Sequence, residues 1–166
     1  MSKPHAVAGE AILTDEYSLH LPHERRRVWN LLRDVTRAPE IVPTCLRAFT
    51  VPGTPAGVGQ QSVFVNRPGG AEHLRLVLVE LTAEELGRLL AWRDLTTGMQ
   101  SSIRLTDRDD GVFLDLVNTW TPTPAQRQFL DCERLLNGTT MMAAGAIRRA
   151  LDTELAVAAT AIAPSP

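Results

Sequence analysis

The chain has 166 residues, of which 44% are hydrophobic, and a formal net charge of −2. These values fit one ordinary domain that buries a core and can still enclose a cavity, and they argue against a large nucleic-acid-binding surface. We therefore expect a single domain over residues 1–166 with an ordered core from about 11 to about 160, and no nucleic-acid partner. Arg25, Arg26 and Arg27 are interpreted as a solvated helix face.

Several kinds of chemistry lack the residues that they need. Cys45 and Cys132 lie in no CxxC motif and the four histidines have no metal-ligand spacing, so we expect reduced thiols and no metal. Lys3 is the only lysine, which argues against Schiff-base catalysis in the core. No GxSxG, GxxxxGK[ST] or GxGxxG motif is present, and no cofactor is expected. The apolar run Ala156 to Ala163 is too short to span a bilayer, and no apolar leader is visible, so we expect a soluble cytoplasmic protein without membrane contact.

The N-terminal third predicts a strand followed by two short helices. Tyr17 to Leu21 alternates as a half-buried strand does, and Pro22 then opens a helix whose apolar residues recur with a period near 3.6. Pro39 to Val42 allows one further helical turn, which Pro43 stops. Six more strands are predicted by alternation and turn residues: Leu46–Val51, Gln61–Asn66, Glu72–Leu81, Leu86–Leu95, Ser101–Thr106 and Val112–Thr121. The hairpin turns are assigned to Pro68-Gly69-Gly70 and to Asp109-Asp110-Gly111.

The remainder of the chain is predicted to be helical. Thr123 is a helix N-cap followed by proline at the first helical position. Gly138 and Gly145 interrupt the stretch, which is either one kinked helix or two consecutive helices ending near Ala159. The small residues around Gly145 either let a helix lie close to a sheet or reflect an alanine-rich composition.

This layout, together with several local motifs, resembles a known superfamily. The motifs are VWNLLRD at Val28 to Asp34, APE at Ala38 to Glu40, AWRDLTTG at Ala91 to Gly98, and LNGTT at Leu136 to Thr140 ahead of IRRALDTE. From Tyr17 to Glu154 the chain resembles the START-like or Bet v 1-like (SRPBCC) superfamily, and within it the aromatic polyketide aromatase/cyclases of the tetracenomycin type. The resemblance implies an α+β helix-grip fold, in which a curved antiparallel sheet of about seven strands wraps a long C-terminal helix.

The resemblance also implies a substrate channel beside the C-terminal helix. In this family an asparagine points from the helix into the channel, and Asn137 occupies that position. Met141, one helical turn later, is then expected to line the same cavity. The alternative is that Asn137 ends a helix, because Asn137-Gly138 is a good stop signal.

The chain departs from the family in the residues expected to do the chemistry. The family arginine falls on Val79 or Leu81, while Arg75 lies further back on the same predicted strand face and is the candidate to replace it. A guanidinium stabilises the oxyanions that develop during aldol ring closure. His73, on the same predicted face, or water is the candidate for proton transfer.

Strand alternation and the resemblance together name further cavity residues. Asn118 and Trp120 share a face with two leucines, and the amide of Asn118 would need a ligand or water there. The alternative, with Asn118 in solvent, would place Asp115 on the core face. Phe64 and Asn66 are expected at the mouth of the cavity, with Tyr17 reaching in from the first strand.

We expect a cofactor-independent polyketide cyclase or aromatase of secondary metabolism. Its partners would be a small hydrophobic or polyketide-like ligand and an acyl carrier protein. The alternative in the same fold is a non-catalytic binding or carrier protein for a hydrophobic metabolite, and a third hypothesis is a chaperone-regulating or stress-response domain. Four polar candidates are more than a lipid carrier needs, which favours the enzyme.

Overall fold

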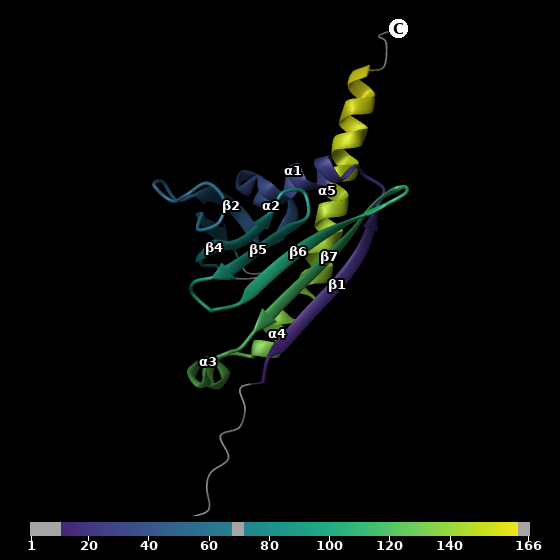
Figure 1. Cartoon of the computed structure of the whole chain (residues 1–166). Helices are drawn as coiled ribbons and strands as arrows, with labels where there is room; N and C mark the ends of the chain where they lie inside the picture. The colour runs from purple at the N-terminus through teal and green to yellow at the C-terminus, as the bar shows by residue number, and fades with distance from the viewer. Residues whose placement is uncertain (1–10, 68–71, 163–166) are drawn as a thin grey trace, which may run out of the picture.

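The computed structural model describes residues 11–67 and 72–162, and within them the chain forms one sheet and a set of helices (Figure 1). The strands are β1 (Leu13–Leu21), β2 (Cys45–Thr50), β3 (Gln61–Asn66), β4 (Arg75–Glu85), β5 (Leu89–Asp94), β6 (Gln100–Arg108) and β7 (Gly111–Trp120). The helices are α1 (Arg25–Arg33), the 3-10 turn η1 (Val35–Arg37), α2 (Ala38–Ile41), α3 (Pro124–Phe129), α4 (Cys132–Leu136) and α5 (Thr139–Ile162).

The sheet is antiparallel throughout and has the strand order β1-β7-β6-β5-β4-β3-β2. The first strand therefore pairs with the last, and β2 forms the opposite edge. The sheet curves around the long helix α5, which runs beside β1 and β7 (Figure 1). The predicted α+β arrangement, with a curved antiparallel sheet, a long C-terminal helix and short helices after the first strand, is confirmed.

Several predicted boundaries are corrected. β4 begins at Arg75 rather than Glu72, so His73 lies before the strand and has no place in its register. β4 also continues to Glu85, and Leu86 belongs to the turn before β5, where Gly87 has a positive φ of 71°. The turn at Asp109-Asp110-Gly111 is confirmed. The predicted hairpin at 68–70 lies outside the described residues.

The C-terminal region is divided differently from either prediction. Three helices follow β7, and the break between α4 and α5 is at Gly138, whose φ of +76° a side chain would disfavour. Gly145 lies inside α5 without interrupting it. Asn137 is consequently the C-cap of α4, its backbone N–H donating to Glu133 O, and is not part of the long helix.

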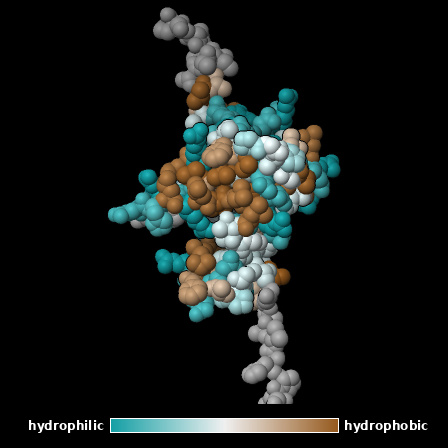
Figure 2. Space-filling model, turned by 90° about the vertical axis from the view of Figure 1, so that its left-hand side faces the viewer, coloured by the Kyte–Doolittle hydropathy of each residue, from teal (hydrophilic) through white to brown (hydrophobic). Residues whose placement is uncertain are grey.

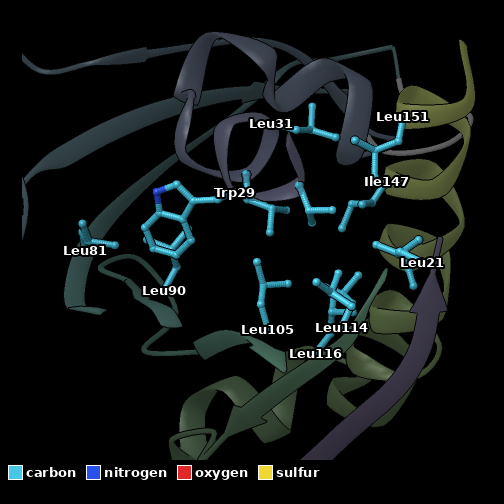
Figure 3. Close-up of a cluster of buried hydrophobic side chains, with 14 residues drawn as sticks. Leu21, Trp29, Leu31, Leu81, Leu90, Leu105, Leu114, Leu116, Ile147 and Leu151 are labelled. Carbon is cyan, nitrogen blue, oxygen red and sulfur yellow. The ribbon is translucent and has the colours of Figure 1, made fainter. Parts of the chain in front are cut away.

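The core lies between the concave face of the sheet and the helices α1 and α5 (Figure 3). Helix α1 buries its apolar face there, and Trp29 is the core anchor that its pattern predicts. Leu114 of β7 and Ile147 of α5 meet these residues from the other two layers. Each fully buried side chain of this size contributes about 1.5–3 kcal/mol.

Helix α5 is also held by polar contacts near its C-terminal half. Arg27 Nε donates to Glu154 Oε2 at 3.1 Å, and Arg37 forms a second ion pair with Glu154. His23, which is buried, lies 3.0 Å from Asp152 through its Nε2 atom. The region of α1 and α2 is thereby joined to α5 by charged groups as well as by the core.

Candidate functional site

One end of the concave face carries a row of polar side chains from three neighbouring strands. Cys45 of β2 pairs with Asn66 of β3, which pairs with Arg75 of β4. Directly opposed residues in an antiparallel sheet point to the same face. Alternation along β4 puts Arg75 on the face of Leu81, which is buried in the core. The row therefore lies on the concave side of the sheet.

Asn66 and Arg75 lack the protein partners that such groups usually have. The Oδ1 atom of Asn66 is buried and has no hydrogen-bond partner. In residues 11–67 and 72–162, no carboxylate lies within ion-pair distance of Arg75, whose side chain is exposed. Buried amide oxygens are nearly always paired, by protein, ligand or water. This end of the concave face therefore holds one unused acceptor beside a cation without an ion pair.

Apolar side chains adjoin this row. Phe64 pairs with Val77 two residues along the strands, on the same face as Asn66 and Arg75, and both side chains are half-buried. Phe64 also packs on the small cluster of Ala38, Cys45 and Ala48. Burial raises the pKa of the Cys45 thiol, so this sulfur stays protonated near neutral pH and is a poor nucleophile. The arrangement offers a ligand an apolar surface, one hydrogen-bond acceptor in Asn66 Oδ1 and the donors of the Arg75 guanidinium.

A second polar cluster ties the opposite edge of the sheet to α5. Asp15 of β1 accepts hydrogen bonds from Gly138 N at 3.1 Å, Thr140 N at 2.9 Å and Thr140 Oγ1 at 2.9 Å. Thr139 Oγ1 lies 3.0 Å from Asp15 Oδ2, and Asn118 Nδ2 donates to the same hydroxyl oxygen at 2.9 Å. The carboxylate thus caps the N-terminus of α5 from a neighbouring strand.

The electrostatics of Asp15 follow from this geometry. Burial alone would raise the pKa of its carboxyl, but the hydrogen bonds from Thr140, Gly138 and Thr139 outweigh burial and hold the pKa below its usual value. Asn118 lies on the inward face, as predicted from alternation, and its amide is met by Thr139. We infer a structural role for this amide, although contact of Asn118 with a ligand stays a prediction.

The other predicted site residues are dispersed. Trp120 is buried, and its Nε1 donates to Thr97 O at 3.0 Å. Tyr17 pairs with Leu116 but is 37% exposed at the sheet edge, and Met141 is 55% exposed. Asn137 is exposed at the end of α4, so it and Met141 do not lie one turn apart on a single helix as expected. The structure brings together Phe64, Asn66 and Arg75 but not the whole predicted set.

Three cavities in the described structure differ in size and position. A cavity of about 20 Å³ between α1 and the sheet has space for about one water molecule. Its polar lining includes Arg33, which donates to Glu84 at 2.7 Å and to Gln60 at 3.0 Å. An open cavity of about 510 Å³ lies between α2 and α5, with Ala146 and Ala150 on its wall. A second open cavity, of about 520 Å³, lies beside α4 and is lined by residues that include Asn137. Ligand pockets usually measure about 300–1,000 Å³, a range that both open cavities reach and the interior cavity does not. Neither Asn66 nor Arg75 lines any of these three cavities.

Sequence reasoning missed Asp15, Thr139 and Arg33. The Thr139-Thr140 pair after Gly138 was the available signal for a helix start, since hydroxyl residues favour helix N-termini. Nothing local to Asp15 indicates that it caps a helix more than a hundred residues away.

Comparison with known proteins identifies the family. Residues 21–158 match the family described as polyketide cyclase / dehydrase and lipid transport. The chain belongs to this family. No curated protein matches this member of the polyketide cyclase / dehydrase family at a significant level.

Solved structures with the same fold include both aromatase/cyclases and other proteins. The di-domain ARO/CYC StfQ of the steffimycin biosynthetic pathway superposes with a TM-score of 0.71 at 13% identity, over 89% of this chain and 53% of StfQ. This chain thus spans about half the length of StfQ. The Zhui aromatase/cyclase from Streptomyces sp. R1128 has a TM-score of 0.68 at 17% identity, over 87% of this chain and 93% of Zhui. Ara h 8.0201 has a TM-score of 0.62 at 13% identity, over 86% and 99% of the two chains. At these identities the neighbours establish the Bet v 1-like fold alone.

In the described part of this family member, no helix is long and apolar enough to cross a membrane.

Proposed function

We propose that this chain is a cofactor-independent polyketide cyclase or aromatase of secondary metabolism, acting in the cytoplasm on a polyketide-like apolar substrate. The observation that carries the proposal is the unpaired, buried Oδ1 of Asn66 opposite Arg75 on the concave face. A poly-β-ketone presents carbonyl oxygens to donors and, in its enol form, a hydroxyl to an acceptor. The membership of the polyketide cyclase / dehydrase family supports the same substrate class.

The proposed reaction is an aldol ring closure followed by loss of water. A base removes a proton from the carbon between two carbonyls, and Arg75 stabilises the resulting enolate oxygen by hydrogen bonds. That carbon attacks a second carbonyl, whose oxygen becomes an alkoxide and takes up a proton. His73, two residues before Arg75, or water carries the proton. The new hydroxyl and a proton from the neighbouring carbon then leave together as water, and enolisation of the remaining ring ketones gives the aromatic ring.

In this proposal, Phe64 and Val77 contribute apolar contacts that hold the polyketide substrate in a folded conformation, in which its reacting carbons meet. Asn66 Oδ1 accepts a hydrogen bond from an enol hydroxyl of the substrate and fixes the position of that hydroxyl against Arg75. We also propose that an acyl carrier protein delivers the substrate.

A non-catalytic binding protein is the second candidate function. The exposure of Arg75 favours it, because a hydrogen bond from a solvated guanidinium stabilises an oxyanion less than one in a dry site. The ligand in this case would be a hydrophobic metabolite held at the same row.

The test is the Arg75→Leu variant with a linear poly-β-ketone thioester as substrate and mass spectrometry of the products. We expect the rate of ring closure to fall about a hundredfold or more, corresponding to about 2–4 kcal/mol of transition-state stabilisation. Arg104→Leu is the matched control, because Arg104 is an exposed strand arginine whose neighbours Ile103 and Leu105 point to the opposite, concave side. An unchanged rate for Arg75→Leu would refute the role of Arg75 in the reaction. Binding of the polyketone by the unaltered chain, with no acceleration over the uncatalysed rate, would establish the binding protein instead.

A further inference from the structure

The outer face of the sheet carries an apolar patch at its β2 end. On the side opposite Asn66 and Arg75, two rows of paired residues cross from β2 to β4, one ending at Leu76 and the other at Leu78. The row of Leu78 continues beyond β5, because Leu95 N donates to Leu78 O. The patch, which we call the outer-face patch, consists of Phe49, Val63, Val65, Leu76, Leu78 and Leu95. Leu76 is 65% exposed, Phe49 41% and Leu95 39%. Figure 2, viewed from the side on which β2 and β4 lie, shows apolar side chains gathered into one area.

The rest of the outer face differs in composition. On β1, β6 and β7 most outward positions are polar and include Glu16, Arg104 and Asp115, with Phe113 and Val117 of β7 as apolar exceptions. Ser18 donates to Asp115 at 2.5 Å. A face that were simply solvated would carry such residues throughout. The apolar composition of the outer-face patch is therefore a local property that indicates an interaction surface.

The size of the patch fits association with a second copy of this chain. Leu46, which precedes Arg47, and Leu74, two residues before Leu76, are also exposed. Together with them the patch presents on the order of 500 Å² of apolar surface, taking about 200 Å² for a fully exposed side chain. Two such faces would bury on the order of 1,000 Å², which reaches the lower bound for a specific interface. Two sheets pack face to face about 10 Å apart in this way.

The charges around the patch fit the same partner. Arg47 of β2 borders one corner of the outer-face patch, and Glu80 of β4 borders the corner diagonally opposite. Glu80 accepts from Arg93 at 3.2 Å, and both side chains are partly exposed. A two-fold axis places the same surface of each copy against the other. If the two-fold axis lies between the two sheets and bisects this diagonal at a right angle, it sets Arg47 of each copy against Glu80 of the other.

We propose that the outer-face patch is the interface of a two-fold symmetric homodimer, with Arg47 and Glu80 paired across it. The Asn66 row lies on the opposite face of the same strands and stays accessible in this dimer. The dimer is independent of the proposed catalytic function.

The experiment is sedimentation velocity of the full chain at about 100 μM, with variants that alter one surface each. We expect a dimer for the unaltered chain and a monomer for Leu76→Glu, since the introduced carboxylate would be buried against an apolar face. Leu86→Glu is the control, because Leu86 is 83% exposed in the β4–β5 turn, and it should remain a dimer. Circular dichroism and thermal unfolding of each variant establish that it is folded.

A charge exchange tests the arrangement within the dimer. Arg47→Glu alone should raise the dissociation constant at least tenfold, and the double variant Arg47→Glu with Glu80→Arg should restore it. A monomer for the unaltered chain, a dimer that survives Leu76→Glu, or dissociation by Leu86→Glu overturns the proposed interface. Failure of the double variant to recover the dimer overturns the pairing of Arg47 with Glu80.

Discussion

The two edges of the sheet differ in how completely their polar groups are paired. At the β1 edge, the carboxylate of Asp15 accepts hydrogen bonds from the start of α5, and Asn118 on the next strand donates to Thr139. Near the β2 edge, Asn66 has a buried oxygen without a partner and Arg75 projects from the start of its strand. The first edge fixes the long helix, and the second leaves groups available to other molecules.

This difference indicates that residues at the β1 edge of the sheet stabilise the fold, whereas residues near the β2 edge are available to bind a ligand. Groups that satisfy each other hold the fold, whereas an unsatisfied buried group lowers stability until a ligand meets it. Substitutions at the β1 edge should therefore destabilise the protein, and those at the Asn66 row should alter binding with little effect on folding.

The largest effect is expected from Asp15→Ala. The substitution leaves several donors at the start of α5 without their acceptor, and we expect the free energy of unfolding to fall by about 2–3 kcal/mol. Urea denaturation measures it, with Glu16→Ala, an exposed carboxylate on the other face of β1, as the control. A loss at Asp15 no larger than at Glu16 would contradict the comparison.

The pH dependence of stability should depend on the same carboxylate. The folded-state pKa of Asp15 is lowered relative to the unfolded value of about 3.9, so its contribution is present above about pH 4 and is lost as the pH falls through the folded pKa. The stability difference between the unaltered chain and Asp15→Asn should therefore be constant between about pH 6 and pH 5 and shrink as the pH falls below about 4. Denaturant midpoints at each pH measure it, and a difference that stays constant over the whole range would refute this role.

A smaller effect is expected for Asn118→Ala, which removes one hydrogen bond to Thr139. We expect a loss of about 1–2 kcal/mol in the free energy of unfolding, with binding of a polyketone at the Asn66 row unchanged. Asn30→Ala, on the exposed side of α1, is the control. Weaker polyketone binding without loss of stability would show instead that Asn118 is a ligand contact.

The smallest change in stability is expected for Asn66→Val. Its amide oxygen is desolvated without a partner, so the free energy of unfolding should change by less than about 0.5 kcal/mol or rise slightly. Polyketone affinity, followed by tryptophan fluorescence, should fall in the same variant. A stability loss above about 1 kcal/mol would show that Asn66 belongs to the structural groups.

The strands could be predicted from the sequence because their signals are local. The turn at Asp109-Asp110-Gly111 and the alternation from Leu114 to Trp120 depend on neighbours in the chain, and the inward position of Asn118 followed from them. His73 was misplaced because the start of a strand depends on its pairing partner: β4 begins where Arg75 meets Asn66, the last residue of β3.

The partners of the site residues could not be predicted, since they come from distant parts of the chain. Asn118 was expected to need a ligand or water, and the structure supplies Thr139 instead, 21 residues later. The outer-face patch was missed for a related reason. Val63, Val65 and Leu78 are typical of core strands, and only the sheet order shows that they lie on the uncovered side.

The two ends of α5 are held by different forces, and this has a kinetic consequence. The N-terminus is held by hydrogen bonds from uncharged N–H and O–H donors to a carboxylate, whereas the C-terminal half is held by ion pairs of Arg27 and Arg37 with Glu154 in addition to the core. Salt screens the attraction between opposite charges at partly exposed sites. Raising the ionic strength should thus weaken the attachment of the C-terminal half more than that of the N-terminus. Backbone amides in that half should then exchange with solvent faster as the salt concentration rises.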